Sequence, residues 1–152
     1  MRLAFYGGGK GKTSAALGVA LRAWGHGMKV LYAGVLKTPV YMGEEVGEYK
    51  AMKRMGIDVI YLSEFKKPQA VLDYVISNAE KYDLVILDEL LYAVRQGFIN
   101  SRHVAMGVET HVVATGNYWI DEFINYFDLV TRLDNVKHYY ATSRIAVRGL
   151  DW

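Results

Sequence analysis

The chain has 152 residues, no cysteine and a formal net charge of +2 at pH 7. This length suits one domain with a substantial hydrophobic core, so we expect residues 1–152 to form a single unit. The lack of cysteine excludes disulfides and thiolate zinc sites, and together with the lack of a signal peptide or long apolar span it favours a cytoplasmic protein with no membrane partner. So small a charge does not favour a nucleic-acid partner.

The first predicted elements are a short strand, a glycine-rich loop and a helix. The strand covers Leu3–Tyr6, and the helix runs from about Lys12 to Trp24, where Gly25-His26-Gly27 is a stop signal. The loop and the first helical turn match a phosphate-binding pattern whose members are Gly7, Gly8, Gly9, Lys10, Gly11, Lys12, Thr13 and Ser14.

Each residue type in this pattern has a chemical reason to be there. Backbone N–H groups of glycines can turn toward phosphate oxygens, and the helix N-terminus adds further donors. Lys12 is placed to neutralise phosphate charge, and the Thr13 hydroxyl is placed to ligate Mg²⁺. Tyr6 stands where the common pattern has its first glycine, so the loop is a variant. The alternative is a flexible glycine turn with two surface lysines.

Apolar strand-like runs then alternate with helical patterns along the chain. Apolar stripes at helical spacing, which we interpret as core, include Val71, Tyr74, Val75 and Ala79, and also Ile120, Phe123, Ile124 and Phe127. The strand-like runs cover Lys29–Ala33, Asp58–Leu62, Leu84–Leu87, His111–Ala114 and Leu129–Thr131. Runs that are apolar throughout are typical of strands covered on both sides, which predicts a mainly parallel sheet with helices on both faces.

The second chemical signal is Asp88-Glu89 at the end of the apolar run Leu84–Leu87. It reads as a Walker B element, because the ends of parallel strands open onto the crevice where a phosphate loop lies. We therefore predict Thr13, Asp88 and Glu89 as magnesium ligands, with Glu89 alternatively orienting a water. Alone, the pair could be an ordinary strand terminus. Together with the loop, it predicts an α/β, three-layer P-loop NTPase fold of the RecA-like branch.

Several other basic residues are candidate phosphate contacts. Arg22, further along the first helix, either reaches the triphosphate or is a solvated surface residue. Lys137, Arg144 and Arg148 near the C-terminus could meet phosphates if the tail folds over the pocket. None of the four histidines shows metal-ligand spacing.

Over most of its length the chain resembles the ATP-dependent corrinoid adenosyltransferases. One matching feature is the loop that lacks its usual first glycine. The chain differs from the family pattern around Ser63–Lys67, at Asn117 and at Tyr139. Members of the family usually have a further segment ahead of the first strand, and we do not expect that segment in this chain. The matching segments are Gly7–Gly18, Leu21-Arg22-Ala23, Gly25-His26-Gly27, Leu87-Asp88-Glu89, Tyr92-Ala93, Gly97, Thr115-Gly116, Asp128–Thr131, Lys137-His138 and Ala146–Trp152.

This resemblance implies transfer of the 5′-deoxyadenosyl group of ATP to the cobalt(I) of a reduced corrinoid, with release of triphosphate. The protein would hold C5′ in line with cobalt and stabilise charge on the leaving triphosphate. Lys12, Glu89 and Arg22 are the expected catalytic residues, with Mg²⁺ as cofactor. The resemblance also implies a homodimer.

Two other classes of function remain open on the sequence alone. One is a RecA-like ATPase or ATP-driven switch in which Glu89 activates water. The other is a noncatalytic nucleotide- or corrinoid-binding relative. The product distinguishes the three classes: triphosphate indicates adenosyl transfer, phosphate indicates hydrolysis, and no product indicates binding alone.

Overall fold

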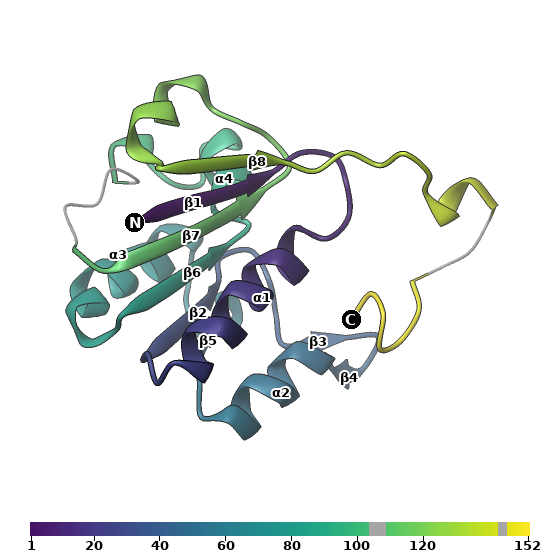
Figure 1. The fold of residues 1–152 in the computed structure, drawn as a ribbon, viewed down its shortest axis with the longest axis horizontal. Coiled ribbons are helices and arrows are strands. Elements are labelled where there is room, and N and C mark those ends of the chain that lie inside the picture. Colours follow the sequence, from purple (N-terminus) through teal and green to yellow (C-terminus); the bar gives the residue numbers. More distant parts are fainter. Residues whose placement is uncertain (104–108, 143–145) are drawn as a thin grey trace.

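The computed structural model describes residues 1–103, 109–142 and 146–152. At the centre of this described part lies a sheet of six strands in the order β5-β2-β6-β7-β1-β8, in which every neighbouring pair is parallel (Figure 1). The strands are β1 (Arg2–Tyr6), β2 (Val30–Gly34), β5 (Asp58–Tyr61), β6 (Leu84–Asp88), β7 (His111–Gly116) and β8 (Leu129–Arg132).

Helices cover both faces of this sheet, because its side chains alternate between two apolar layers. Tyr32, Ile86 and Val113 point to one face and pack with α1 (Lys12–Gly25) and α2 (Gly47–Met55). The other face, with Leu31 and Val85 among its members, packs with α3 (Pro68–Asn78) and α4 (Leu90–Arg95). Figure 1 shows α1 and α2 in front of the sheet and α3 and α4 behind it. The predicted three-layer α/β class is confirmed.

The predicted strands and first helix agree with the structure to within one or two residues at each end. The apolar stripe from Ile120 to Phe127 has α-helical spacing and was expected to lie in the core, and for Ile124 this prediction was wrong. The segment Asp121–Tyr126 is a 3₁₀ helix, in which Phe123 is buried and Ile124 is 51% exposed. A 3₁₀ helix has about three residues per turn, so residues four apart, such as Ile120 and Ile124, do not share a side as they would in an α-helix.

A small hairpin and helix α2 lie between β2 and β5, and the sequence analysis did not identify them. The hairpin pairs β3 (Val40–Tyr41) with β4 (Glu44–Glu45), and strands of two residues are too short to leave a periodic signal. Single 3₁₀ turns complete the described elements: Leu62–Glu64, Ala79–Lys81, Ser101–His103 and Tyr139–Thr142. Among the described residues, no helix has the length and apolar character needed to span a bilayer.

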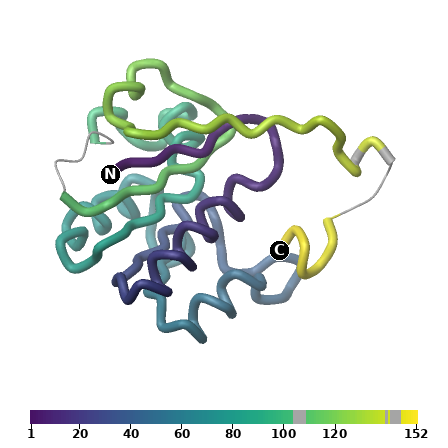
Figure 2. Tube along the Cα trace, in the orientation of Figure 1, coloured from purple at the N-terminus to yellow at the C-terminus, as the bar shows by residue number. Residues whose placement is uncertain are grey.

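After β8 the chain runs away from the sheet, and its C-terminal end returns to the side of the hairpin (Figure 2). Trp152 packs edge-on against Tyr41, with ring centroids 5.4 Å apart. Residues from the start of α1, from α2 and from the C-terminus line one shared cavity. The fold therefore brings the C-terminal end of the sequence to the carboxyl edge of the sheet, beside the start of α1.

Candidate nucleotide site

The glycine-rich loop joins β1 to α1 and is shaped by close contacts with its neighbours. Gly7 and Gly11 have positive φ angles of 117° and 101°, which side chains with a Cβ rarely adopt. A Cβ on Gly9 would lie 2.6 Å from the carbonyl oxygen of Leu133, and the Gly9 N–H donates to that oxygen at 2.8 Å. The glycines are thus required as much by the segment after β8 as by any ligand.

Asn135 fixes the outer side of the same loop. Its Oδ1 accepts from the Lys10 N–H at 2.9 Å, and its Nδ2 donates to the Gly8 carbonyl at 3.3 Å. Gly8 itself is exposed and has open space around it. The loop is therefore held from one side by the chain that follows β8.

Helix α1 starts directly after the loop, and its N-terminus favours an anion. Gly11 provides no side-chain cap, and the first turn contains no acidic residue, so its N–H dipoles are not neutralised locally. The Lys12 ammonium donates to the Gly9 carbonyl at 2.7 Å, across the mouth of the loop. Burial lowers the pKa of Lys12, with the Glu89 and Asp88 carboxylates opposing that shift.

Asp88 ends β6 and is completely buried. Its carboxylate accepts hydrogen bonds from Tyr32 Oη at 2.7 Å, from Thr13 Oγ1 at 3.1 Å and from Thr115 Oγ1, and it forms an ion pair with Lys37 Nζ at 2.6 Å. Burial would raise the pKa of Asp88, but the Lys37 charge and these donors outweigh it and leave the pKa below its ordinary value. Asp88 is an ionised carboxylate with its oxygens fully engaged.

Strand β7 lies between β1 and β6 and connects the loop to the acidic pair. The Thr115 hydroxyl accepts from the Glu89 N–H at 2.9 Å, and the Gly116 carbonyl accepts from the Gly7 N–H at 3.2 Å. A Cβ on Gly116 would lie 2.6 Å from the backbone nitrogen of Tyr92. The Thr-Gly pair therefore sets the distance between the two predicted halves of the site.

Glu89 follows Asp88 in the left-handed conformation, with φ of 65°, which is strained for a non-glycine residue. Burial and the neighbouring Asp88 charge raise the pKa of Glu89, while Lys37 and Lys12 oppose the increase. Its side chain lines a cavity of about 430 Å³ beside the loop. The other lining residues are Lys10, Gly11, Lys12, Thr13, Ser14, Lys37, Leu150 and Asp151.

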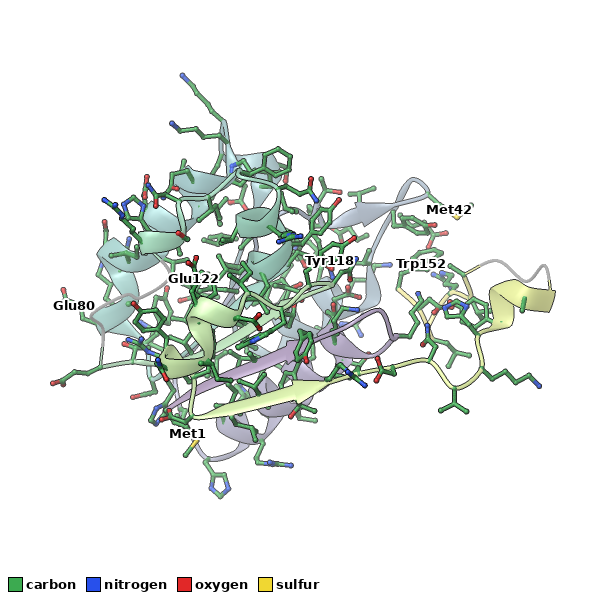
Figure 3. The ribbon with its side chains drawn as sticks, turned by 90° about the horizontal axis from the view of Figure 1, so that it is seen from above. Met1, Met42, Glu80, Tyr118, Glu122 and Trp152 are labelled. Carbon is green, nitrogen blue, oxygen red and sulfur yellow. The ribbon has the colours of Figure 1, made fainter. Side chains whose placement is uncertain are left out.

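The C-terminal segment covers the outer side of this cavity. Asp151 pairs with the Lys10 ammonium at 3.2 Å and accepts hydrogen bonds from Tyr139 Oη and the Val147 N–H. Figure 3 shows Trp152 on the same side of the molecule as Met42, at the tip of the hairpin. The tail thus does fold over the predicted pocket.

The structure does not bring every predicted basic residue to this place. Arg22 is exposed in the last turn of α1, and a helix rise of about 1.5 Å per residue puts it about 15 Å from Lys12. Arg148 pairs with Glu44 of the hairpin at 2.9 Å, and Lys137 is exposed. Arg144 lies outside the described residues. Contact between Arg22 and the triphosphate therefore stays a prediction that this position does not support.

Three members of the site were missed by the sequence analysis as partners of Asp88. Tyr32 was interpreted only as part of an apolar strand, and Thr115 was named only in a segment that resembles the family. Lys37 belongs to no recognised motif. It lies three residues after the end of β2. Its signal is positional: Gly34, at the end of β2, pairs in register with Asp88.

Within the described residues, no cluster of three or more His, Cys, Asp and Glu side chains is placed to hold a metal ion. The predicted oxygen ligands are the Thr13 hydroxyl and the carboxylates of Asp88 and Glu89. Mg²⁺ usually takes one or two protein oxygens and completes its shell with water and phosphate. This donor set therefore fits Mg²⁺ bound together with a polyphosphate.

The fold and the loop define an α/β protein of the P-loop-like class. Its residues 1–152 match the family described as ATP:corrinoid adenosyltransferase BtuR/CobO/CobP. The chain belongs to this family, whose members are transferases that adenosylate corrinoids.

Curated relatives agree with this assignment over almost the whole chain. The corrinoid adenosyltransferase of Pseudomonas aeruginosa is 29% identical, over 96% of this chain and 80% of its own length. That of Escherichia coli K12 is 28% identical, over 99% of this chain and 84% of its own. Corrinoid adenosyltransferase CobA of Salmonella typhimurium LT2 is 26% identical, over 99% of this chain and 84% of its own length. The resemblance found from the motifs is confirmed.

Proposed function

We propose that this protein transfers the 5′-deoxyadenosyl group of ATP to cobalt(I) of a reduced corrinoid and releases triphosphate. The cobalt–carbon bond forms as the C5′–oxygen bond breaks, and the electron pair of that bond leaves with the triphosphate oxygen. The observation that carries the proposal is the single cavity into which the loop, Lys12, Thr13 and Glu89 all face. Its residues suit a triphosphate leaving group.

In this proposal the residues of the chain act mainly by placing charge. Residues 7–14 bind the triphosphate through the loop and the α1 N-terminus, which meets developing negative charge with fixed dipoles. Lys12 leaves the Gly9 carbonyl for a phosphate oxygen, a short movement because both line the mouth of the loop. No side-chain nucleophile is needed, since cobalt(I) itself attacks.

We assign Thr13, Asp88 and Glu89 to Mg²⁺, which would supply additional neutralisation of the triphosphate. Thr13 and Glu89 face the cavity, so they are the closest ligands to the substrate. Asp88, with both oxygens already accepting hydrogen bonds, orients Thr13 and sets the charge of the pocket. Thr13 and Glu89 would therefore hold the cation on the substrate side, and Asp88 would hold it from the buried side.

We place the corrinoid on the aromatic side of the same sheet edge. Tyr118 is 48% exposed and stacks on Tyr92 with ring centroids 6.1 Å apart, while the Arg95 guanidinium lies 5.9 Å above the Tyr118 ring. Flat aromatic surfaces suit a flat macrocycle. Figure 3 marks Tyr118 near the middle of this view. Tyr118→Ala should raise KM for the corrinoid and leave KM for ATP unchanged.

We also propose that the protein works as a homodimer, as the sequence resemblance implies, and that it is cytoplasmic, as its lack of cysteine favours. Light scattering at micromolar concentration measures the mass directly. A mass equal to one chain would remove the dimer from the proposal and leave the reaction untouched.

Anaerobic incubation with MgATP and reduced cob(I)alamin tests the reaction. Loss of the cobalt(I) absorption with an equal amount of triphosphate is the expected result. Unchanged cobalt(I) with appearance of phosphate would instead support an ATPase, and unchanged cobalt(I) with no product would support a binding protein. Glu89→Gln should abolish product formation in either catalytic case.

A further inference from the structure

Lys37 occupies a particular position between two predicted magnesium ligands. Its ammonium lies 2.6 Å from Asp88 Oδ2 and donates to Thr13 Oγ1 at 2.8 Å. A divalent cation held by Thr13 and Asp88 would need the same space, directly between the same two oxygens. Two positive groups cannot share it, because each replaces the other as the counter-charge of a buried carboxylate.

The backbone fixes where Lys37 can reach. The Val35 N–H donates to the Asp88 carbonyl at 3.0 Å, and the Leu62 N–H donates to the Lys37 carbonyl at 3.1 Å. These bonds attach the segment after β2 to β6 on one side and to the end of β5 on the other. Lys37 is thus anchored beside Asp88 by two neighbours of β2 in the sheet.

The end of the side chain still has room to move. The Lys37 side chain is 30% exposed, whereas that of Asp88 is not exposed at all. Lys37 lines the same cavity as Lys12, Thr13 and Glu89, so its ammonium can turn from Asp88 toward a phosphate group there without backbone movement. A lysine carries its charge on a flexible four-carbon stem, which suits such a movement.

We propose that Lys37 is a further residue of the triphosphate site: its ammonium competes with the divalent cation for Thr13 and Asp88, and it turns onto the triphosphate when the cation binds. The inference rests on the proposed function in one respect, the assignment of Thr13 and Asp88 to the metal. Binding of the cation and of the triphosphate would then be cooperative. The cation alone displaces Lys37 from Asp88 without giving it a new anionic partner, and the triphosphate alone draws Lys37 away and leaves Asp88 without a counter-charge.

Direct measurement of Mn²⁺ binding tests this competition without substrate turnover. Mn²⁺ prefers the same oxygen ligands as Mg²⁺, and its free concentration is measured by electron paramagnetic resonance. Wild type and Lys37→Met are titrated with Mn²⁺ alone. Lys66→Met, which removes an exposed lysine after β5, is the matched control.

Removal of the competing charge should strengthen Mn²⁺ binding to Lys37→Met by about tenfold or more, as expected for a close charge. Lys66→Met should bind Mn²⁺ as wild type does, and Lys37→Arg, which keeps the charge, should stay near wild type. Equal Mn²⁺ affinity in wild type and Lys37→Met, or weaker binding in the variant, would overturn the proposal.

Lys37→Met leaves Asp88 without its cation and is expected to lose stability. If the variant is unfolded without metal, the same titration is followed by circular dichroism, and refolding on addition of Mn²⁺ supports the proposal. A variant that stays unfolded with Mn²⁺, while the charge-neutral double variant Lys37→Met/Asp88→Asn folds, overturns it.

A second titration, with inorganic triphosphate in the presence of Mg²⁺, tests the movement of Lys37. Lys37→Met should bind Mg²⁺–triphosphate about tenfold or more weakly than wild type, since a close ammonium is lost. Unchanged triphosphate affinity would overturn this half of the proposal. Neither titration involves a corrinoid, so failure of adenosyl transfer with the expected binding results would remove the proposed reaction and retain the role of Lys37.

Discussion

The two sides of the glycine-rich loop are built in different ways. The inner side has a buried acidic centre, Asp88, backed by Tyr32 and Thr115. Its other members line the cavity: Lys12, Thr13, Lys37 and Glu89. The outer side is made of segments after β8: Asn135 holds the loop, and Asp151 pairs with an exposed Lys10.

The two sides therefore differ in how much their contacts contribute to stability. Buried hydrogen bonds and ion pairs cost stability when one partner is lost, whereas an exposed pair contributes little. We therefore expect changes on the inner side to affect folding and chemistry, and changes in the outer side's charges to affect only the closure of the cavity.

Replacement of Asp88 by alanine should have the largest effect. It leaves Lys37, Tyr32, Thr115 and Thr13 without their acceptor, and we expect a loss of about 3 kcal/mol in the free energy of unfolding, the lower end of the usual range because Lys37 retains some contact with water. Urea unfolding at pH 7 measures it. Asp73→Ala, which removes an exposed carboxylate from α3, should cost less than about 0.5 kcal/mol.

An equal effect of these two substitutions would contradict the comparison, because it would show that the buried network adds no stability beyond a surface carboxylate. Adenosyl transfer by Asp88→Ala should fall to background. Retained activity would move the proposed metal assignment entirely to Thr13 and Glu89.

The two loop lysines, one on each side, should differ in how much their loss lowers kcat. Lys12→Met removes the partly buried ammonium at the mouth of the loop, and kcat should fall about 10²–10³-fold, as for loss of one transition-state donor. Lys10→Met removes an exposed ammonium that pairs with Asp151, and the decrease should be about tenfold or less. Steady-state kinetics with MgATP and cob(I)alamin give both values. A larger loss for Lys10→Met would reverse the assignment of the two sides.

The inner side was partly predictable because much of it comes from local patterns. Lys12 and Thr13 begin the helix after the glycine-rich loop, and Asp88 and Glu89 stand at the end of an apolar strand. The sequence marks both places clearly, and the structure brings the four residues together. Lys37 and Tyr32 could not be assigned in the same way. Their contact with Asp88 depends on β2 and β6 being neighbours in the sheet, a pairing between segments about 50 residues apart that no local pattern encodes.

The outer side was predictable only as a possibility. The sequence allows the tail to fold over the pocket, and Arg148 was one of three residues that could then meet phosphates. In the structure the tail does cover the pocket, but Arg148 pairs with Glu44 and the carboxylate of Asp151 faces the loop. The hairpin that carries Glu44 has two-residue strands, so its partner could not be foreseen from periodicity.

Two neighbouring glycines test where the outer segment presses on the loop. A Cβ on Gly9 would collide with the backbone around Leu133, whereas a Cβ on Gly8 would meet nothing within 4 Å. We expect Gly9→Ala to lower the free energy of unfolding by about 1–3 kcal/mol, as overpacking usually does, and Gly8→Ala to change it by less than about 0.5 kcal/mol. Urea unfolding of both variants measures the difference, and equal losses would show that the contact with Leu133 yields without cost.

The smallest effect should come from Asp151, and it should depend on pH. The hydroxyl of Tyr139 and then the N–H of Val147 stabilise its carboxylate and lower its pKa to about 2. Because the folded pKa lies below the unfolded value of about 3.9, its contribution to stability is present above about pH 4 and is lost as the pH falls toward 2. Melting curves of wild type and Asp151→Asn at low salt should therefore differ slightly at pH 6, converge near pH 2, and differ less at high salt because exposed pairs are screened. A difference that persists unchanged to pH 2 would mean that packing of the tail, for example Trp152 on Tyr41, holds the outer side closed without help from this charge.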